Sequence, residues 1–130
     1  MANNDLVKTW LDVGRNDMAA VEQLTTHHPL MLEIVCFHCQ QAAEKFLKAY
    51  LLARTDEQPP RMHELSSLCG QCAEFEPAFL SIERECVRLN PYGVVVRYPH
   101  EIPLEEADMR QAVQDMYTVT QFIQRQLSQE

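Results

Sequence analysis

The chain has little glycine and no long apolar run. Only 3 of its 130 residues are glycine, and its prolines stand between periodic segments. Scarce glycine together with abundant Ala, Leu and Gln favours helix over sheet. No run reaches the 18 apolar residues that a membrane-spanning helix needs, and the opening MANNDLVKTW has no secretory leader pattern. We therefore expect one all-α domain over residues 1–130, in the cytoplasm and without a membrane partner.

Basic residues are also few. There are 11 Lys and Arg against 19 Asp and Glu, so the formal net charge is −8. This balance argues against a large basic surface for non-specific nucleic-acid binding. Arg84, Arg88 and Arg97 lie within one short region, however, so a local basic cleft is still compatible with the sequence.

The five cysteines are an odd number, and several fall at helix-core positions. This fits a reducing compartment better than a disulfide framework. Two C-x-x-C pairs, Cys36/Cys39 and Cys69/Cys72, would indicate zinc in a loop-rich chain. The first pair lies inside a predicted helix, where cysteine serves as a small apolar side chain. We therefore predict no metal site and no cofactor.

The stretch 34–53 is predicted to be a long central helix. Its apolar residues form two sets at helical spacing, which indicates packing on both sides. The polar residues that remain form a narrow stripe, predicted to face water or a partner: Glu33, Gln40, Gln41, Glu44 and Lys48.

The remaining helices are expected on both sides of this one. Periodicity and proline positions place them at about 3–24, from 63 to between Gly70 and Pro77, at 77–89, and at 104–127. Asp17 falls on the apolar stripe of the first helix, so it should have a hydrogen-bonding partner. The segment Asn90–Pro103 has three prolines and a β-branched run and is predicted to be extended or a loop, where functional residues often lie.

Several strings together resemble the HEPN domain family. They are CFHCQQAAEKFLKAYLL, preceded by W-L-x-x-G-x-x-D-M (from Trp10) and followed by P-x-x-H-E-L (from Pro60) and R-Y-P (from Arg97). The resemblance covers nearly the whole chain. It implies an up-and-down bundle of four or five helices, usually a homodimer, with polar residues near a cleft at the dimer face. Small prokaryotic members look like partners of minimal nucleotidyltransferases, encoded beside them as toxin and antitoxin.

Many toxins of this superfamily are metal-independent ribonucleases, whose signature is an Arg followed after four to six residues by a His. Here only Tyr98 and Pro99 separate Arg97 from His100, and no other Arg is followed by a His at that interval. RNA cleavage of this kind needs a cation over the phosphate and a proton-transferring group at the same 2′-OH and phosphate. The sequence therefore departs from the ribonuclease pattern.

Two groups of residues are candidates for binding nucleotide or RNA. His38, Gln41 and Lys45 share one side of the central helix, where they can meet a phosphate, although an isolated His38 would be a hydrogen-bonded core residue. Arg97 offers a planar fork for phosphate, Tyr98 can stack on a base, and His100 can titrate near neutrality. The residues of this second group can equally anchor the loop in which they lie.

Three hypotheses follow. The first is a dimeric binding subunit for a nucleotide, RNA or a nucleotidyltransferase partner, without strong catalysis of its own. The second is an endoribonuclease toxin that uses Arg97 with His100 or His38. The third is an interaction subunit whose acidic surface meets a basic partner.

Overall fold

The computed structural model describes residues 2–93 and 103–129. These residues form five α-helices, two short 3-10 helices and no strand, so the all-α prediction is confirmed. None of these helices is both long and apolar enough to cross a membrane. The elements in chain order are α1 (Ala2–Leu24), α2 (Leu32–Thr55), α3 (Leu65–Phe75), η1 (Pro77–Ile82), α4 (Glu83–Leu89), η2 (Asn90–Gly93) and α5 (Glu106–Ser128).

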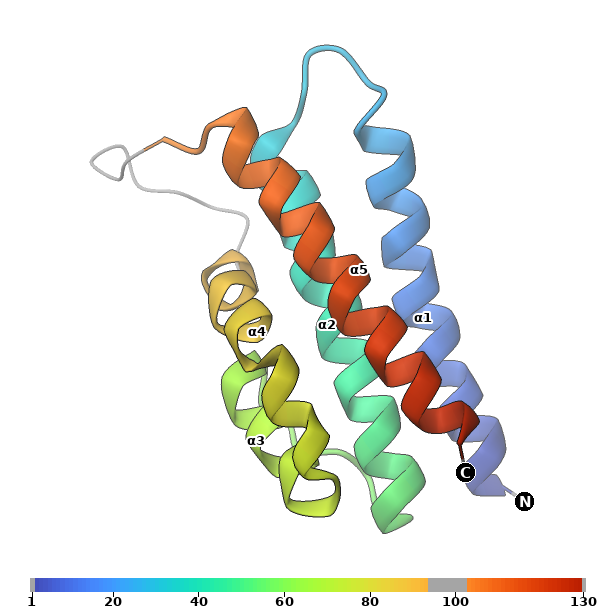
Figure 1. Cartoon of the computed structure of the whole chain (residues 1–130). Coiled ribbons are helices and arrows are strands. Elements are labelled where there is room, and N and C mark those ends of the chain that lie inside the picture. Colours follow the sequence, from blue (N-terminus) through green and yellow to red (C-terminus); the bar gives the residue numbers. More distant parts are fainter. Residues whose placement is uncertain (1, 94–102, 130) are drawn as a thin grey trace.

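Helix α2 is the centre of the bundle. Helices α1 and α5 both pack along it, and α3, α4 and η2 contact it from the other side. In Figure 1 the three long helices α1, α2 and α5 form one group and the shorter α3 and α4 form a second, with both chain ends at the same end of the bundle. The predicted two-sided burial of α2 is therefore confirmed.

The connection 56–64 runs back along α2 before α3 begins. The carbonyl oxygen of His63 accepts a hydrogen bond from Gln40, near the middle of α2. Further along the chain, the Sγ of Cys72 lies 3.7 Å from the carbonyl oxygen of Leu47. Helix α3 therefore runs in the same direction as α2, and the segment before it lies against the polar side of α2.

Close packing of α1 on α2 depends on Gly14. A Cβ atom at Gly14 would lie 2.7 Å from Cδ1 of Phe46, which is closer than van der Waals contact allows. The Phe46 ring is 2% exposed, so it fills the space beneath α1. The glycine in the W-L-x-x-G string thus has a packing role.

All five cysteines are buried and none forms a disulfide, as the core interpretation predicted. Burial raises the pKa of Cys39 and of Cys72 well above the ordinary thiol value. These thiols are therefore protonated at neutral pH and behave as small apolar side chains.

Two elements differ in type from the sequence prediction. The fourth helix does not begin as an α-helix at Pro77, because Pro77–Ile82 forms the 3-10 helix η1. With three residues per turn, Phe79 and Ile82 point to the same side, and both are buried. The segment predicted to be extended or a loop begins instead with the helical turn η2, and its residues 94–102 lie outside the described residues.

Candidate functional site

The row of polar residues that the sequence predicted on α2, from Glu33 to Lys48, is only partly exposed. Gln40, Glu44 and Lys48 are 0%, 2% and 4% exposed, so the prediction that this row faces water or a partner is wrong for these three residues. Elements distant in the sequence cover these three side chains. Nζ of Lys48 lies 5.7 Å from the centre of the Trp10 ring on α1, and the returning segment before α3 covers Gln40.

Glu44 is the centre of a buried hydrogen-bond network. Its carboxylate accepts from Nζ of Lys48 at 3.1 Å, from Nδ1 of His63 at 2.8 Å and from the Gln40 amide at 3.3 Å. Burial, the largest single effect, would raise the pKa of Glu44, but the hydrogen bonds from His63 and Lys48, together with the positive charges of Lys48 and Lys45, lower the pKa below its ordinary value. The network therefore holds α2 against the segment before α3.

Four half-buried residues remain open to solvent on this side, and we call them the α2 stripe: Phe37, His38, Gln41 and Lys45. Gln41 stands nine residues before the buried Tyr50. Nine residues are two and a half helical turns, so Gln41 and the rest of the α2 stripe lie on the side of α2 opposite this core residue. Nζ of Lys45 donates to Oε1 of Gln41 at 2.7 Å. The structure thus brings the three predicted residues of α2 together on one surface.

His38 is oriented by a carboxylate from α1. Its Nδ1 lies 2.9 Å from Oδ1 of Asp17, and the two side chains are 29% and 16% exposed. The prediction that Asp17 has a hydrogen-bonding partner is confirmed. When Nδ1 donates to Asp17, the other ring nitrogen, Nε2, is left for a ligand.

A cavity of about 440 Å³ opens beside the α2 stripe. Its lining comes from α2, from the segment before α3, and from η2: Phe37, Gln40, Gln41, His63, Glu64, Asn90, Pro91 and Gly93. We call it the α2–η2 pocket. Its volume lies in the range of small-molecule sites.

Sequence reasoning did not assign Phe37, Glu64 or Asn90 to a site. Phe37 precedes Gln41 by one helical turn, so helical spacing was a usable signal for it. Nothing in the sequence indicates that Asn90 lies beside α2. It does so because its Oδ1 accepts the backbone N–H of Leu65 at 2.7 Å, which joins the end of α4 to the start of α3.

The other predicted site residues, Arg97, Tyr98 and His100, lie outside the described residues. The chain enters that segment from Gly93, which itself lines the α2–η2 pocket. Their part in a site therefore stays a prediction.

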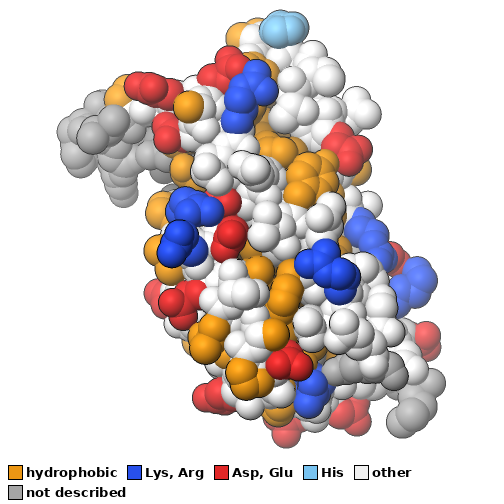
Figure 2. Space-filling view, viewed as in Figure 1, with side chains coloured by type: hydrophobic (Ala, Val, Ile, Leu, Met, Phe, Trp, Pro, Cys, Tyr) orange, Lys and Arg blue, Asp and Glu red, His pale blue; other side chains and the backbone are white. Residues whose placement is uncertain are grey.

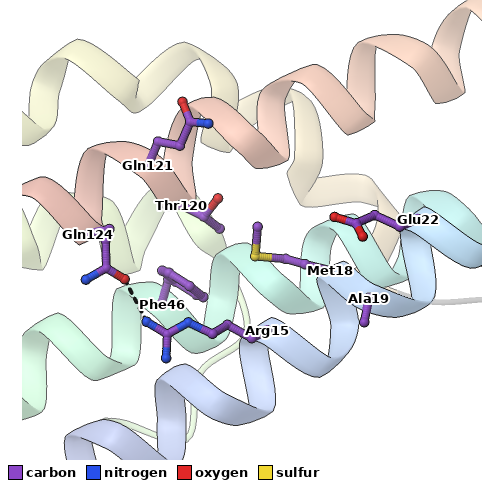
Figure 3. Close-up of a pocket in the computed structure, with 8 residues that line it drawn as sticks. All are labelled: Arg15, Met18, Ala19, Glu22, Phe46, Thr120, Gln121 and Gln124. Atoms are coloured by element: carbon purple, nitrogen blue, oxygen red, sulfur yellow. Dashed lines mark hydrogen bonds between the residues drawn. The ribbon is translucent and has the colours of Figure 1, made fainter.

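A second cavity, of about 380 Å³, lies between α1 and α5 on the other side of the bundle. Figure 3 shows Phe46 and Met18 between the two helices and Arg15 turned toward Gln124. The Arg15 guanidinium is already bound, at 2.8 Å to Gln124 and at 3.3 Å to Asp12. None of the predicted site residues that the structure describes lines this cavity.

The face formed by α1, α4 and α5 has no concentrated positive charge. In Figure 2 its described Lys and Arg side chains are scattered among acidic ones. Within residues 2–93 and 103–129, no cluster of three or more His, Cys, Asp or Glu side chains is arranged to hold a metal ion. The α2 stripe and its pocket are therefore the best candidate site among the described residues.

Comparison with known proteins decides the family. The sequence-family model of the HEPN domain matches residues 7–126, which is nearly the whole chain. This chain belongs to the HEPN domain family. The crystal structure of TT1696 from Thermus thermophilus is similar to this HEPN chain at a TM-score of 0.76 and 22% sequence identity, covering 92% of this chain and 96% of TT1696. That likeness shows the fold alone. No curated protein matches the sequence.

Proposed function

We propose that this HEPN protein binds a nucleotide or single-stranded RNA along the α2 stripe, as a subunit without strong catalysis of its own. The observation that carries the proposal is the placement of Lys45. Its ammonium group bonds Gln41 at 2.7 Å, and Gln41 in turn lines the α2–η2 pocket together with Phe37. An amide and an aromatic ring therefore line the cavity, and a cation is hydrogen-bonded to that amide.

These groups suit the chemistry of a nucleotide. The Lys45 ammonium has three N–H donors and, within the described part of the chain, uses one on Gln41, which leaves two for a phosphate. The imidazole of His38 adds a further polar group on the same side of α2. Phe37 is half-buried and offers a surface on which a base can stack. Arg97 and Tyr98, which follow Gly93 closely in the sequence, are proposed to add a phosphate contact and a second stacking group.

We further propose that the subunit is a homodimer paired with a minimal nucleotidyltransferase, as toxin and antitoxin. The resemblance to small prokaryotic HEPN proteins supports the pairing. Leu6 and Val13 support self-association, because they stand two turns apart on α1 and are 43% and 41% exposed. In light scattering after gel filtration we expect twice the monomer mass for the wild type. A Leu6→Glu, Val13→Glu double variant that stays dimeric would exclude this face.

Fluorescence anisotropy with a labelled single-stranded RNA tests the binding proposal. We expect Lys45→Met to weaken binding and to reduce the slope of log K against log salt by about 0.7, the value of one lost phosphate contact. Methionine keeps the apolar stem that packs near Gly14. Lys8→Met, a matched loss of charge at an exposed position of α1, should leave both quantities unchanged. Equal effects of the two substitutions would show a general charge effect and contradict the proposal.

The second candidate is a metal-independent endoribonuclease that uses Arg97 with His100 or His38. The oriented imidazole favours it, because Asp17 holds His38 in the tautomer that a proton-transfer group needs. Incubation with a mixed RNA in EDTA, beside Arg97→Ala and His38→Asn variants, distinguishes the two functions. Cleavage that Arg97→Ala abolishes would establish the enzyme, and the effect of His38→Asn would then distinguish His38 from His100. No cleavage at protein well above RNA concentration would reject it.

A further inference from the structure

We propose that the α2–η2 pocket receives a guanine base, with Glu64, Asn90 and Gln41 as the groups that recognise it. This inference rests on the proposed binding of nucleotide or RNA and names the base that it selects. It follows from the polar groups that line the pocket and from those among them that are not already hydrogen-bonded to the protein.

Gln40 has no donor for a ligand, because both N–H groups of its amide are already hydrogen-bonded within the protein. Its Oε1 accepts from Gln41 at 2.7 Å, and its Nε2 donates to Glu44 and to the carbonyl oxygen of His63. Gln40 is 0% exposed, so its side chain lies at the base of the pocket in a fixed orientation. A ligand must therefore be recognised by the groups around it.

Among the contacts of the described residues, two donors remain available. The Gln41 amide uses one N–H on Gln40, which leaves the second. The Asn90 side chain accepts through Oδ1 from the N–H of Leu65, and that bond fixes its NH₂ group as the end left for a ligand. Both bonds orient the side chains before a ligand arrives, which reduces the entropy lost on binding.

Among the described residues, one charged acceptor remains available, in addition to the Nε2 atom of His63, whose Nδ1 is bound to Glu44. Oε1 of Glu64 accepts from the hydroxyls of Ser66 and Ser67 at 3.3 Å and 2.6 Å, which holds the carboxylate at the start of α3. Within the described residues Oε2 of Glu64 has no partner. A carboxylate in the pocket repels phosphate, so the base enters the pocket and the phosphate stays at Lys45, outside its lining.

Guanine matches this set of groups better than the other bases. It presents two neighbouring acceptors, O6 and N7, whereas adenine presents an acceptor beside a donor. The N–H groups of Asn90 and Gln41 suit the acceptor pair, and the N1–H and N2–H₂ donors of guanine suit the carboxylate of Glu64. Phe37, which also lines the pocket, supplies a stacking surface for the purine.

Two labelled RNAs of equal length and charge, UUUGUUU and UUUAUUU, test the inference by anisotropy titration. We expect the RNA with guanine to bind about tenfold more tightly, the discrimination of one good set of base-edge hydrogen bonds. Inosine in place of guanine keeps O6, N7 and N1–H but lacks the N2 amine, and should lose part of this preference. Glu64→Gln should reduce the preference to less than twofold, while Glu57→Gln, which makes the same charge change in the 56–64 connection, should keep it.

The outcomes separate the two proposals. Equal binding of both RNAs by the wild type would overturn the guanine site and leave the RNA-binding function standing. A guanine preference that survives Glu64→Gln would overturn the role of Glu64 and with it the proposed site. Failure of the wild type to bind either RNA, at protein concentrations up to the millimolar range, would overturn the proposed function itself. Circular dichroism of Glu64→Gln shows whether α3 still forms.

Discussion

Oδ1 of Asp17 lies 2.9 Å from Nδ1 of His38, across the contact between α1 and α2. The carboxylate is the more buried of the two groups, so the pair both joins the helices and orients the imidazole. The same bond thus serves the stability of the bundle and the arrangement of the α2 stripe.

Removal of this pair should destabilise the fold cooperatively. We expect Asp17→Ala to lower the free energy of unfolding by about 1–3 kcal/mol, the range for a hydrogen bond to a charged group that is left unmade. In a double-mutant cycle with His38→Ala the coupling should be at least about 0.5 kcal/mol. Urea denaturation measures both. A coupling of zero would show that the two residues act independently.

The glycines provide a matched pair of substitutions. Gly14→Ala should lower the free energy of unfolding by about 1–3 kcal/mol, because the new methyl group overlaps the buried Phe46 ring. Gly70→Ala should raise it by about 0.5–1 kcal/mol, since Gly70 lies within α3 with open space around it and alanine is the better helix former. Thermal and urea unfolding of both variants check the opposite signs. A stabilising Gly14→Ala would contradict the close approach of α1 to α2.

Acid should weaken the network around Glu44. Its pKa is lowered in the folded state, so the ionised carboxylate contributes stability above its ordinary value of about 4.5, and this contribution is lost as the pH falls through the lower folded pKa. Glu44→Gln leaves the buried ammonium of Lys48 without a charged partner, and we expect a cost of about 3 kcal/mol at pH 7.

Urea unfolding of the wild type and Glu44→Gln at pH 7 and pH 3.5 tests this. The difference between the two proteins should be smaller at the lower pH. Glu106→Gln, at an exposed ion pair with Arg110, serves as the control and should behave as the wild type at both values. An unchanged difference at the lower pH would show that Glu44 does not titrate as expected.

The cysteines should be inert in the folded protein. All five thiols are buried, so a disulfide reagent has little access to them, and burial raises the pKa of Cys39 and Cys72, so these two carry little thiolate at pH 8. A hydrogen bond with Cys86 lowers the pKa of Cys69, so burial alone protects that thiol. With Ellman's reagent we expect no rapid reaction in the native state and five reactive thiols in guanidinium chloride. Rapid native reaction of one thiol would indicate local opening of its helix.

Local patterns predicted the helices well, because helix formation reflects residues three and four apart. The two-sided burial of α2 and the core role of Cys36 and Cys39 follow from such spacing. The bounds of η1 could not be predicted in this way, since a 3-10 turn at Pro77–Ile82 is selected by how Phe79 and Ile82 meet the core.

The candidate site was predicted in part. Spacing alone placed His38, Gln41 and Lys45 on one side of a helix, and the structure joins Lys45 to Gln41. Spacing could not reveal that Gln40 and Glu44 are buried, because their cover comes from His63, some twenty residues away in the sequence. Spacing could not place Asn90 and Glu64 at the pocket either, because they reach it through the contact between the end of α4 and the start of α3.

The sequence by itself determined the fold class, the family and the side of α2 on which His38, Gln41 and Lys45 stand, since these depend on composition, short strings and helical periodicity. Only the tertiary structure decided which polar groups are hydrogen-bonded within the protein and which are left for a ligand. That division depends on the return of residues 56–64 along α2, which buries Glu44 beside Lys48 and His63, whereas Lys45 stays half-buried next to Gln41, a lining residue of the pocket. Hydrogen-bond partners distant in the sequence make that choice, and no local pattern records them.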